Sequence, residues 1–261
     1  GFGGSTRNGG MVSGGVNVGK GYIAKALPPD EAAPFLNDAA EAFGHIEDLI
    51  AREHIDCGWT RAGYFVGAWS RAHFAPMQKK VDLLNRHSNA EAYLVPEEKQ
   101  RAEIGSDFYR GGMVVGRAGH LHPALYFKGL LDLVTRAKTV MAARTPVLSL
   151  NPRGGSIDVV TSRGTIRTHD VIVATNGYTG DATPEFKRRV VPIGSYIIAT
   201  EELSEDLAKA LSPRNRSIAD TQRLLSYYRL SPDGRRMIFG GRAKFSPTDP
   251  KEAAPVLYQM M

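Results

Sequence analysis

The stretch DVIVATNGYTG, residues 170–180, carries the strongest fold signal in the sequence. Residues 171–173 are an unbroken apolar run of β-branched side chains, which is typical of a strand buried on both faces of a parallel sheet. The run ends in the small residues 174–177, which let a ligand approach the backbone. Open α/β sheets bind ligands at the carboxyl ends of their strands. The stretch therefore predicts a buried strand followed by a ligand-binding turn.

Strand-like segments lie on both sides of this stretch. Before it, short β-rich runs are separated by RGG and SRG turns, which predicts a small antiparallel meander: TVMA (139–142), PVLSL (146–150), SIDVV (156–160) and TIRT (165–168). After it come VVPIGSYIIAT (190–200), LLSYYRLS (224–231) and RRMIFGGRAKF (235–245), the last two joined by a Pro-Asp-Gly turn. The C-terminal part is therefore expected to be mainly antiparallel β-structure.

Helices are predicted by apolar residues at three- and four-residue steps. One face comprises Leu36, Ala39, Phe43, Ile46 and Ile50. Ser70 is a candidate N-cap for a second helix, whose face comprises Phe74, Met77, Val81 and Leu84. Pro123 suits the first turn of a third, with Phe127, Leu130, Leu131 and Val134 on its face. With the buried strand, these helices indicate an α/β fold that includes a second, β-rich domain.

Composition limits the classes of function. The chain has 261 residues, 42% of them hydrophobic and 23% charged, which is enough for one large domain or two ordinary ones. The net charge is +6, but the 33 basic residues are scattered among 27 acidic ones, so nucleic-acid binding is not expected. No run of apolar residues reaches bilayer length, and the single cysteine, Cys57, suits a reducing compartment. We expect a cytoplasmic protein, although a targeting segment upstream of Gly1 would be invisible here.

The glycine-rich opening, GFGGSTRNGGMVSGGVNVGKG (1–21), has several interpretations. Residues 14–20 satisfy the G-x-x-x-x-G-K pattern of a P-loop, but Gly21 stands where Ser or Thr would bind magnesium. The dinucleotide fingerprint G-x-G-x-x-G fails at Thr6. A glycine-rich surface connection without a ligand is the third interpretation.

A resemblance supplies a fourth interpretation. STRNGGM (5–11) resembles the S-x-R-N-G-G stretch of FAD-dependent amine oxidoreductases in the D-amino-acid oxidase (DAO) family, in particular the gamma-glutamylputrescine oxidase-like branch. Similar family sequence follows in order at CGW (57–59), GHLHP (119–123), TPV (145–147), VIVATNGYTG (171–180), RRVVPIGSYIIAT (188–200) and DTQRLLSYYRLSPDGRRMIFGGR (220–242). The set covers nearly the whole chain and is more specific than any one motif.

The resemblance implies a discontinuous domain organisation. It assigns residues 1–55 and 119–185 to an incomplete Rossmann-like FAD/NAD(P)-binding domain. Residues 56–118 and 186–261 are assigned to an incomplete substrate domain of antiparallel β-sheet and helices. In the family, a βαβ unit with the glycine fingerprint precedes the S-x-R-N-G-G loop, and a C-terminal segment returns to the flavin. The chain is therefore expected to be an internal fragment that lacks both.

The resemblance also implies a cofactor, FAD, and the residues that contact it. These are Ser5, Thr6, Arg7, Asn8 and Gly9 in the opening loop, Val147 near the adenine, and Ala174, Thr175, Asn176 and Gly177 in the second turn. For Val147, an ordinary core position is the competing interpretation. Glycine in the loop also suits anion binding, because backbone N–H groups can then point at a diphosphate.

The implied reaction oxidises the C–N bond of a small amine or amino acid to an imine. The sequence identifies no catalytic residue, since the flavin supplies the hydride acceptor. The candidates for the substrate site are Tyr228, Arg242 and His120. His120 also suits a structural role and Arg242 a solvated strand end. Cys57 is expected to be a small buried group, and no cluster has metal-ligand spacing. The alternatives are a P-loop nucleotide-binding protein and a non-catalytic flavin-fold binding module.

Overall fold

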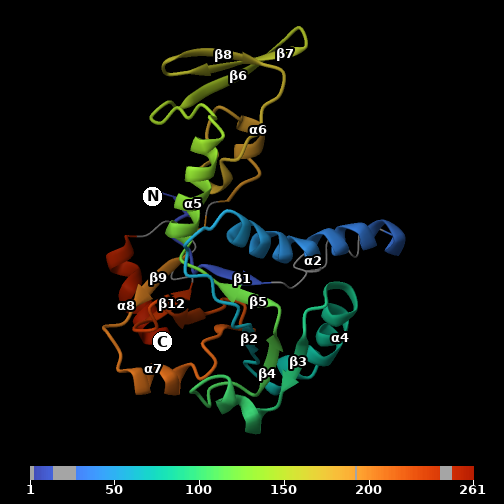
Figure 1. Cartoon of the computed structure of the whole chain (residues 1–261), viewed down its shortest axis with the longest axis vertical. Helices are drawn as coiled ribbons and strands as arrows, with labels where there is room; N and C mark the ends of the chain where they lie inside the picture. The colour runs from blue at the N-terminus through green and yellow to red at the C-terminus, as the bar shows by residue number, and fades with distance from the viewer. Residues whose placement is uncertain (1–2, 14–27, 192, 242–248) are drawn as a thin grey trace. The chain divides into compact units, whose positions relative to one another are not determined.

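Helices and strands alternate irregularly along the chain in the computed structural model, which describes residues 3–13, 28–191, 193–241 and 249–261 (Figure 1). The α-helices are α2 (Pro29–Arg52), α3 (Arg71–Phe74), α4 (Met77–Ser88), α5 (Pro123–Arg136), α6 (Pro184–Lys187), α7 (Glu205–Leu211) and α8 (Pro250–Met260). Short 3-10 helices are η2 (Glu97–Ala102) and η3 (Asn176–Tyr178). The strands are β1 (Met11–Ser13), β2 (Tyr64–Gly67), β3 (Ala92–Val95), β4 (Gly112–Val115), β5 (Ala118–His120), β6 (Val147–Arg153), β7 (Ser156–Thr161), β8 (Gly164–Thr168), β9 (Tyr196–Ala199), β10 (Ser217–Asp220), β11 (Tyr227–Leu230) and β12 (Met237–Gly241).

The predicted helices are confirmed. Ser70 caps α3, because its hydroxyl accepts a hydrogen bond from the backbone N–H of His73. Pro123 begins α5, as its ring allows in a first turn. Phe43 and Ile50 of α2 are buried, so the three- and four-residue spacing did mark an inward face.

The main sheet has seven strands in the order β3-β4-β2-β10-β11-β12-β9. All neighbouring strands are antiparallel except β10 and β2, which are parallel. Successive side chains of a strand point to opposite faces, so the register assigns each residue to a face. Phe65, Ile218 and Tyr228 are direct neighbours across three strands and share one face. Val66, Ala219 and Tyr227 share the other.

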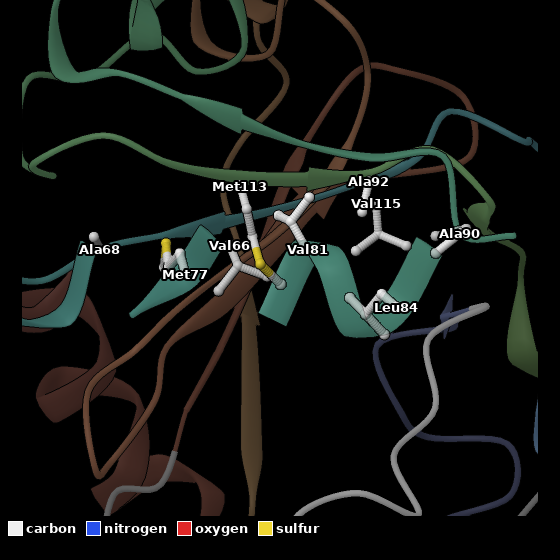
Figure 2. Packing of buried hydrophobic residues seen from close by; sticks show 10 residues of the cluster. Val66, Ala68, Met77, Val81, Leu84, Ala90, Ala92, Met113 and Val115 are labelled. Atoms are coloured by element: carbon white, nitrogen blue, oxygen red, sulfur yellow. The ribbon is translucent and has the colours of Figure 1, made fainter. Parts of the chain in front are cut away.

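Helix α4 covers the face of Val66 (Figure 2). Met77, Val81 and Leu84 of the helix pack against Val66 and against Met113 of β4. All five are at most 8% exposed. Burial of side chains of this size stabilises a fold by about 1.5–3 kcal/mol each, so this layer is a main source of stability.

A separate apolar cluster lies between α2, α5 and the short β1-β5 sheet. Ile50, Ile55, Cys57 and Leu121 form its buried centre. Helix α5 approaches closely at Gly129, where a Cβ atom would lie 2.4 Å from Cγ2 of Ile55. Cys57 is buried and desolvation raises its pKa, as expected for a packing residue.

The described residues separate into two compact units. The larger contains those within 1–134, 195–243 and 250–261, and the smaller those within 135–194 together with Asp249. Each is described below by itself. The predicted assignment of residues 1–55 and 119–185 to a cofactor domain concerns function, and it stays a prediction.

The smaller unit contains the predicted meander, a three-stranded antiparallel sheet in the order β6-β7-β8. The turn between β6 and β7 is made by Gly154 and Gly155, with φ of 53° and 81°. These left-handed conformations suit a tight hairpin and favour glycine. The SRG turn joins β7 to β8, so PVLSL, SIDVV and TIRT are confirmed as strands.

The prediction of a buried strand at residues 171–173 is wrong. The structure assigns no strand there, and Ile172 is 92% exposed. A strand needs a neighbour to accept and donate its backbone hydrogen bonds, and none of the described residues pairs with this run. TVMA is likewise not a strand, and Val140 is 93% exposed. Apolar composition alone did not create a ladder in either place.

Candidate functional site

The opening loop, residues 3–10, is closed by its own hydrogen bonds. The N–H of Thr6 donates to the carbonyl of Gly3 at 3.2 Å. Asn8 bridges the loop: its Nδ2 donates to the carbonyl of Gly4 at 2.9 Å, and its Oδ1 accepts from the N–H of Gly10 at 2.8 Å. The Asn8 side chain is therefore committed to loop geometry, and its main chain is the part available to a ligand.

Two glycines let this loop lie against the main sheet. Gly10 has φ of 63°, and a Cβ atom there would lie 2.1 Å from the carbonyl oxygen of Leu121. A Cβ atom at Gly9 would lie 3.2 Å from Cε2 of Tyr227 on β11. A Cβ atom at Gly10 would collide with the backbone of Leu121, and one at Gly9 would make a tight contact with the ring of Tyr227. Gly10 is therefore needed to seat the loop, and Gly9 lets the loop lie close to Tyr227, apart from any contact with a ligand.

Arg229 ties the loop to two other segments. It is 2% exposed. Its Nε donates to the carbonyl of Gly9 at 2.6 Å, its Nη2 to that of Leu121 at 2.8 Å and its Nη1 to that of Leu230 at 2.9 Å. Desolvation lowers its pKa to about 10, which leaves the guanidinium charged at neutral pH. This side chain, the Arg229 clamp, fixes the loop against β11 and the start of α5.

The fixed loop has the properties of an anion site. The backbone N–H groups of Ser5, Asn8 and Gly9 form no hydrogen bond within the part of the chain that the structure describes. A Cβ atom built on Gly4 meets nothing within 4 Å, so that side of the loop is open. Ser5 and Asn8 also line a cavity of about 220 Å³. Unengaged N–H groups on an open, glycine-rich turn suit a diphosphate.

His120 does not face this opening. It lies on β5, is 2% exposed and is paired in a bridge with Thr60. Its Nε2 lies 3.4 Å from the carbonyl oxygen of Asn215, and its Nδ1 is buried without a partner among the described residues. Desolvation, and then the charge of Arg229, lowers the pKa of His120 to about 4. The imidazole is therefore neutral and enclosed at pH 7, which fits the structural role.

The two tyrosines of β11 lie on opposite faces, as their adjacent positions predict. Tyr227 packs on the opening loop, and its hydroxyl lies 2.9 Å from the hydroxyl of Ser195. Tyr228 lies on the other face, stacked on Phe239 with ring centroids 5.6 Å apart. The structure therefore brings Tyr227 to the predicted cofactor loop and does not bring Tyr228 there. Arg242 and the P-loop-like residues 14–20 lie outside the described residues.

The other predicted cofactor residues belong to the smaller unit. Val147 begins β6 and is 42% exposed, so it is not the core valine of the competing interpretation. Residues 174–177 form an exposed turn, in which Asn176 has φ of 48° and begins η3. The predicted turn is present although the strand before it is absent.

Sequence reasoning missed Arg229, and it selected Tyr228 and not its neighbour Tyr227 for the substrate site. The two-residue spacing of Tyr227 and Arg229 on a predicted strand placed them on one face, but the sequence alone did not say which face met the loop. A buried strand arginine also resembles an exposed one in sequence, since most arginines are exposed.

The structure also bears on metals and membranes. Among the described residues, no three His, Cys, Asp or Glu side chains come close enough together to hold a metal ion. In the same residues, no helix combines the length and the apolar character needed to cross a bilayer.

Comparison with known sequences gives a match over almost the entire chain. Residues 1–260 match the family described as FAD dependent oxidoreductase (DAO). The chain is 32% identical over 253 residues to gamma-glutamylputrescine oxidoreductase of Escherichia coli, covering 97% of this chain and 59% of that protein. It is 32% identical over 248 residues to a probable oxidoreductase, OrdL, of Haemophilus influenzae, covering 92% and 56%. The chain therefore spans less than two thirds of these relatives.

Solved structures show the same fold at low sequence identity. Glycine oxidase from Geobacillus kaustophilus aligns with a TM-score of 0.72 and 13% identity, over 99% of this chain and 67% of that one. L-proline dehydrogenase from P. horikoshii aligns with a TM-score of 0.66 and 13% identity, over 85% and 62%. The mixed α/β fold with a substantial antiparallel sheet is thus that of the flavin-dependent oxidase structures.

Proposed function

The chain belongs to the FAD dependent oxidoreductase (DAO) family, and on that premise we propose that the protein oxidises the C–N bond of an amine or amino acid to an imine. The relatives support this class, since their names specify gamma-glutamylputrescine, glycine and proline as substrates. These substrates have a nitrogen beside an oxidisable C–H bond. Because the chain covers 59% of the E. coli relative, the activity of the whole protein is our inference.

The observation that carries the proposal is the clamped opening loop. We infer that the N–H groups of Ser5, Asn8 and Gly9, together with Thr6 and Arg7, hold the diphosphate of FAD. Gly4 leaves that side of the loop open, and the Arg229 clamp prevents the loop from moving away from β11. A preorganised loop binds at lower entropic cost than a mobile one. For the smaller unit taken by itself, Val147 and residues 174–177 are the proposed cofactor contacts.

FAD, when bound, would supply the hydride acceptor for the carbon beside the nitrogen. The substrate would lose this hydride and a proton from its nitrogen to become an imine, which water would hydrolyse to a carbonyl compound and an amine or ammonia. Oxygen or another acceptor would be the final oxidant. On the protein side, Tyr227 and Ser195 share the loop face, and their hydroxyls lie 2.9 Å apart. We propose that this pair orients the substrate. This geometry supports Tyr227 over Tyr228 for the role, and the burial of His120 supports a packing role for that side chain.

Screening small molecules for flavin reduction tests the reaction class. The flavin-loaded protein is mixed without oxygen with a panel of primary and secondary amines, amino acids, alcohols and 2-hydroxy acids, and flavin absorbance is followed. We expect bleaching by one or more of the amines or amino acids. Bleaching by alcohols or 2-hydroxy acids alone would contradict the proposal.

We also propose a small-molecule substrate and a cytoplasmic location. The location is in keeping with the single buried cysteine.

Replacing Gly4 tests the loop. A valine there meets no protein atom within 4 Å of its Cβ, so the protein should fold normally while the side chain occupies the space proposed for FAD. We expect FAD affinity to fall by at least about tenfold, measured by flavin fluorescence titration. Gly180→Val is the matched control, because its Cβ is equally unobstructed and it lies outside the proposed contacts. Equal FAD affinity in the two variants would refute the loop assignment.

A further inference from the structure

A buried carboxylate lies on the sheet face opposite the opening loop. Asp220 ends β10 and is 6% exposed. Its carboxylate accepts hydrogen bonds from the backbone N–H and side-chain amide of Gln222, at 2.9 and 3.0 Å, and from the N–H of Ser226 at 3.4 Å. Asp220 forms no ion pair with any residue in the described ranges. Its negative charge is thus held by dipoles and is not neutralised by a protein cation.

This carboxylate borders a cavity of about 610 Å³. The size is within the range of small-ligand sites, roughly 300–1,000 Å³. The register places Asp220 beside Gly67, and the ring of Tyr109 lies over that glycine, 2.6 Å from where a Cβ would be. The absence of a side chain at Gly67 therefore makes room for an aromatic ring next to the carboxylate.

Aromatic rings form part of the remaining wall. Trp69 and Phe108 have ring centroids 4.8 Å apart, and Phe108 and Tyr109 are 5.3 Å apart, both pairs edge to face. Tyr228 and Phe239 stack on the other side. All five rings line the cavity.

Among the described residues that line the cavity, Asp220 has the one charged side chain. The hydroxyls of Tyr109 and Tyr228 lie 3.0 Å apart and share a hydrogen bond. Desolvation raises the pKa of Tyr109 to about 12 and that of Tyr228 well above its usual value, and the charge of Asp220 adds to both shifts. Both tyrosines are therefore neutral, and the wall combines the side-chain carboxylate of Asp220 with aromatic rings.

We propose that this cavity is a binding site for a small organic cation, a primary or secondary alkylammonium ion, with Asp220 as its counter-ion. Ammonium ions are attracted both to a desolvated carboxylate and to the faces of aromatic rings. A carboxylate ligand would be repelled, and a neutral ligand would leave the buried charge uncompensated. A divalent metal prefers six or more oxygen ligands, and Asp220 supplies one carboxylate.

The site is separate from the proposed flavin site. Tyr227 faces the opening loop and Tyr228 faces the cavity, so the sheet itself lies between the two. A protein that oxidises amines would thereby carry a second amine site outside its reaction centre, where amine concentration could be sensed without turnover. This inference concerns a different face from the proposed function and does not depend on it.

Titration of the flavin-loaded protein with tert-butylammonium chloride tests the site. This cation has no hydrogen on the carbon beside its nitrogen and cannot be oxidised to an imine, so calorimetry reports binding alone. The neutral comparison ligand is tert-butanol. We expect the cation to bind more tightly than the alcohol. Asp220→Asn should lower the affinity for the cation by at least about tenfold and leave the affinity for the alcohol unchanged. Asp132→Asn on α5, an exposed acid paired with Lys128, should match the wild type.

Several results would overturn the proposal. Equal affinity for the two ligands, or unchanged cation affinity in Asp220→Asn, would show that the carboxylate does not recognise the cation. If Asp220→Asn does not fold, Trp69→Leu replaces it, because Trp69 is 43% exposed and tolerates substitution better. The affinity of Trp69→Leu for the cation should fall severalfold. Unchanged affinity would refute the site. Failure of every amine to bleach the flavin would instead contradict the proposed reaction and leave these titrations unaffected.

Discussion

The seven-stranded sheet, which is antiparallel except between β10 and β2, and the antiparallel three-stranded meander differ completely in burial. Every buried residue of the described chain lies in the larger unit, and none lies within residues 135–194. All six residues of β7, the central strand of the meander, are only half-buried. In the larger unit, by contrast, β2, β4 and β10 are almost wholly buried.

The difference shows that forming a hydrogen-bonded sheet and burying a core are separate requirements, although the same sequence patterns are used to predict both. A ladder of backbone hydrogen bonds needs only suitable turns and an alternating strand, and Gly154–Gly155 supplies the turn in the meander. A core also needs a second layer, which α4 provides for the main sheet. We therefore expect the stability of the described chain to reside chiefly in the larger unit.

The largest effect should come from the centre of the main sheet. Phe65→Ala removes a ring that is fully buried between Val114 and Ile218. Such truncations cost about 3–5 kcal/mol, because the cavity left behind closes only in part. Urea unfolding followed by tryptophan fluorescence measures the change. Val159→Ala in the half-buried strand β7 should cost less than about 1 kcal/mol, and similar losses for the two variants would break the comparison.

The next effect should come from the Arg229 clamp. Arg229→Met keeps the volume of the stem but removes three hydrogen bonds and leaves the carbonyls of Gly9 and Leu121 without this donor. We expect a loss of about 2–4 kcal/mol in unfolding free energy, and faster hydrogen exchange in residues 9–12. Arg235→Met, an exposed arginine paired with Glu202, should change stability by less than about 1 kcal/mol. Unchanged exchange in residues 9–12 would show that the loop does not need its anchor.

A pH-dependent effect should come from His120. Its pKa is about 4 in the folded protein and 6.5 as a free side chain, so the unfolded chain binds the proton more readily between these values. Keeping His120 neutral therefore makes no demand on the unfolding free energy above pH 6.5. As the pH falls toward 4, the unfolding free energy decreases by up to about 3 kcal/mol because of this residue. Unfolding free energies from pH 4 to 7 should therefore rise less steeply in His120→Gln. His45→Gln, at an exposed position of α2, is the control. Parallel pH profiles of the unfolding free energy in the wild type and His120→Gln would contradict the assignment.

The smallest effect should come from the run that looked most like a core strand. Ile172→Ser changes a residue that is 92% exposed, so we expect less than about 0.5 kcal/mol on urea unfolding of this chain. A loss of 2 kcal/mol or more in unfolding free energy would mean that residues 171–173 are packed in solution. That result would support the buried strand that the sequence predicted.

Much of the fold could be read from the sequence wherever its signals were local. The cap at Ser70, the start of α5 at Pro123 and the turns of the meander depend on residues a few positions apart. The missed features depend on distant partners. Residues 171–173 have the composition of a buried strand, but their structure depends on a neighbour that composition does not specify. The same holds for the cavity, where β10 meets Gly67 of a strand far earlier in the chain.

The site shows the same division. The glycines at positions 9 and 10 marked a loop that needs close backbone approach, and the structure supplies the reason in Tyr227 and Leu121. The flavin contacts assigned by resemblance stay predictions. Arg229 carried no sequence signal because its three partners are main-chain carbonyls, which any residue type provides.

The Arg229 clamp also sets an order of events during folding. Arg229 hydrogen-bonds to Gly9, which lies 220 positions earlier in the chain, and to Leu121, which lies 108 positions earlier. Contacts of such long range form only after the intervening segments have collapsed, because closing a long loop costs chain entropy before any bond is gained. On the ribosome, residues 3–10 emerge long before β11, yet they cannot be anchored until β11 has been synthesised and paired. A segment that is synthesised before its partners is therefore among the last to reach its final conformation.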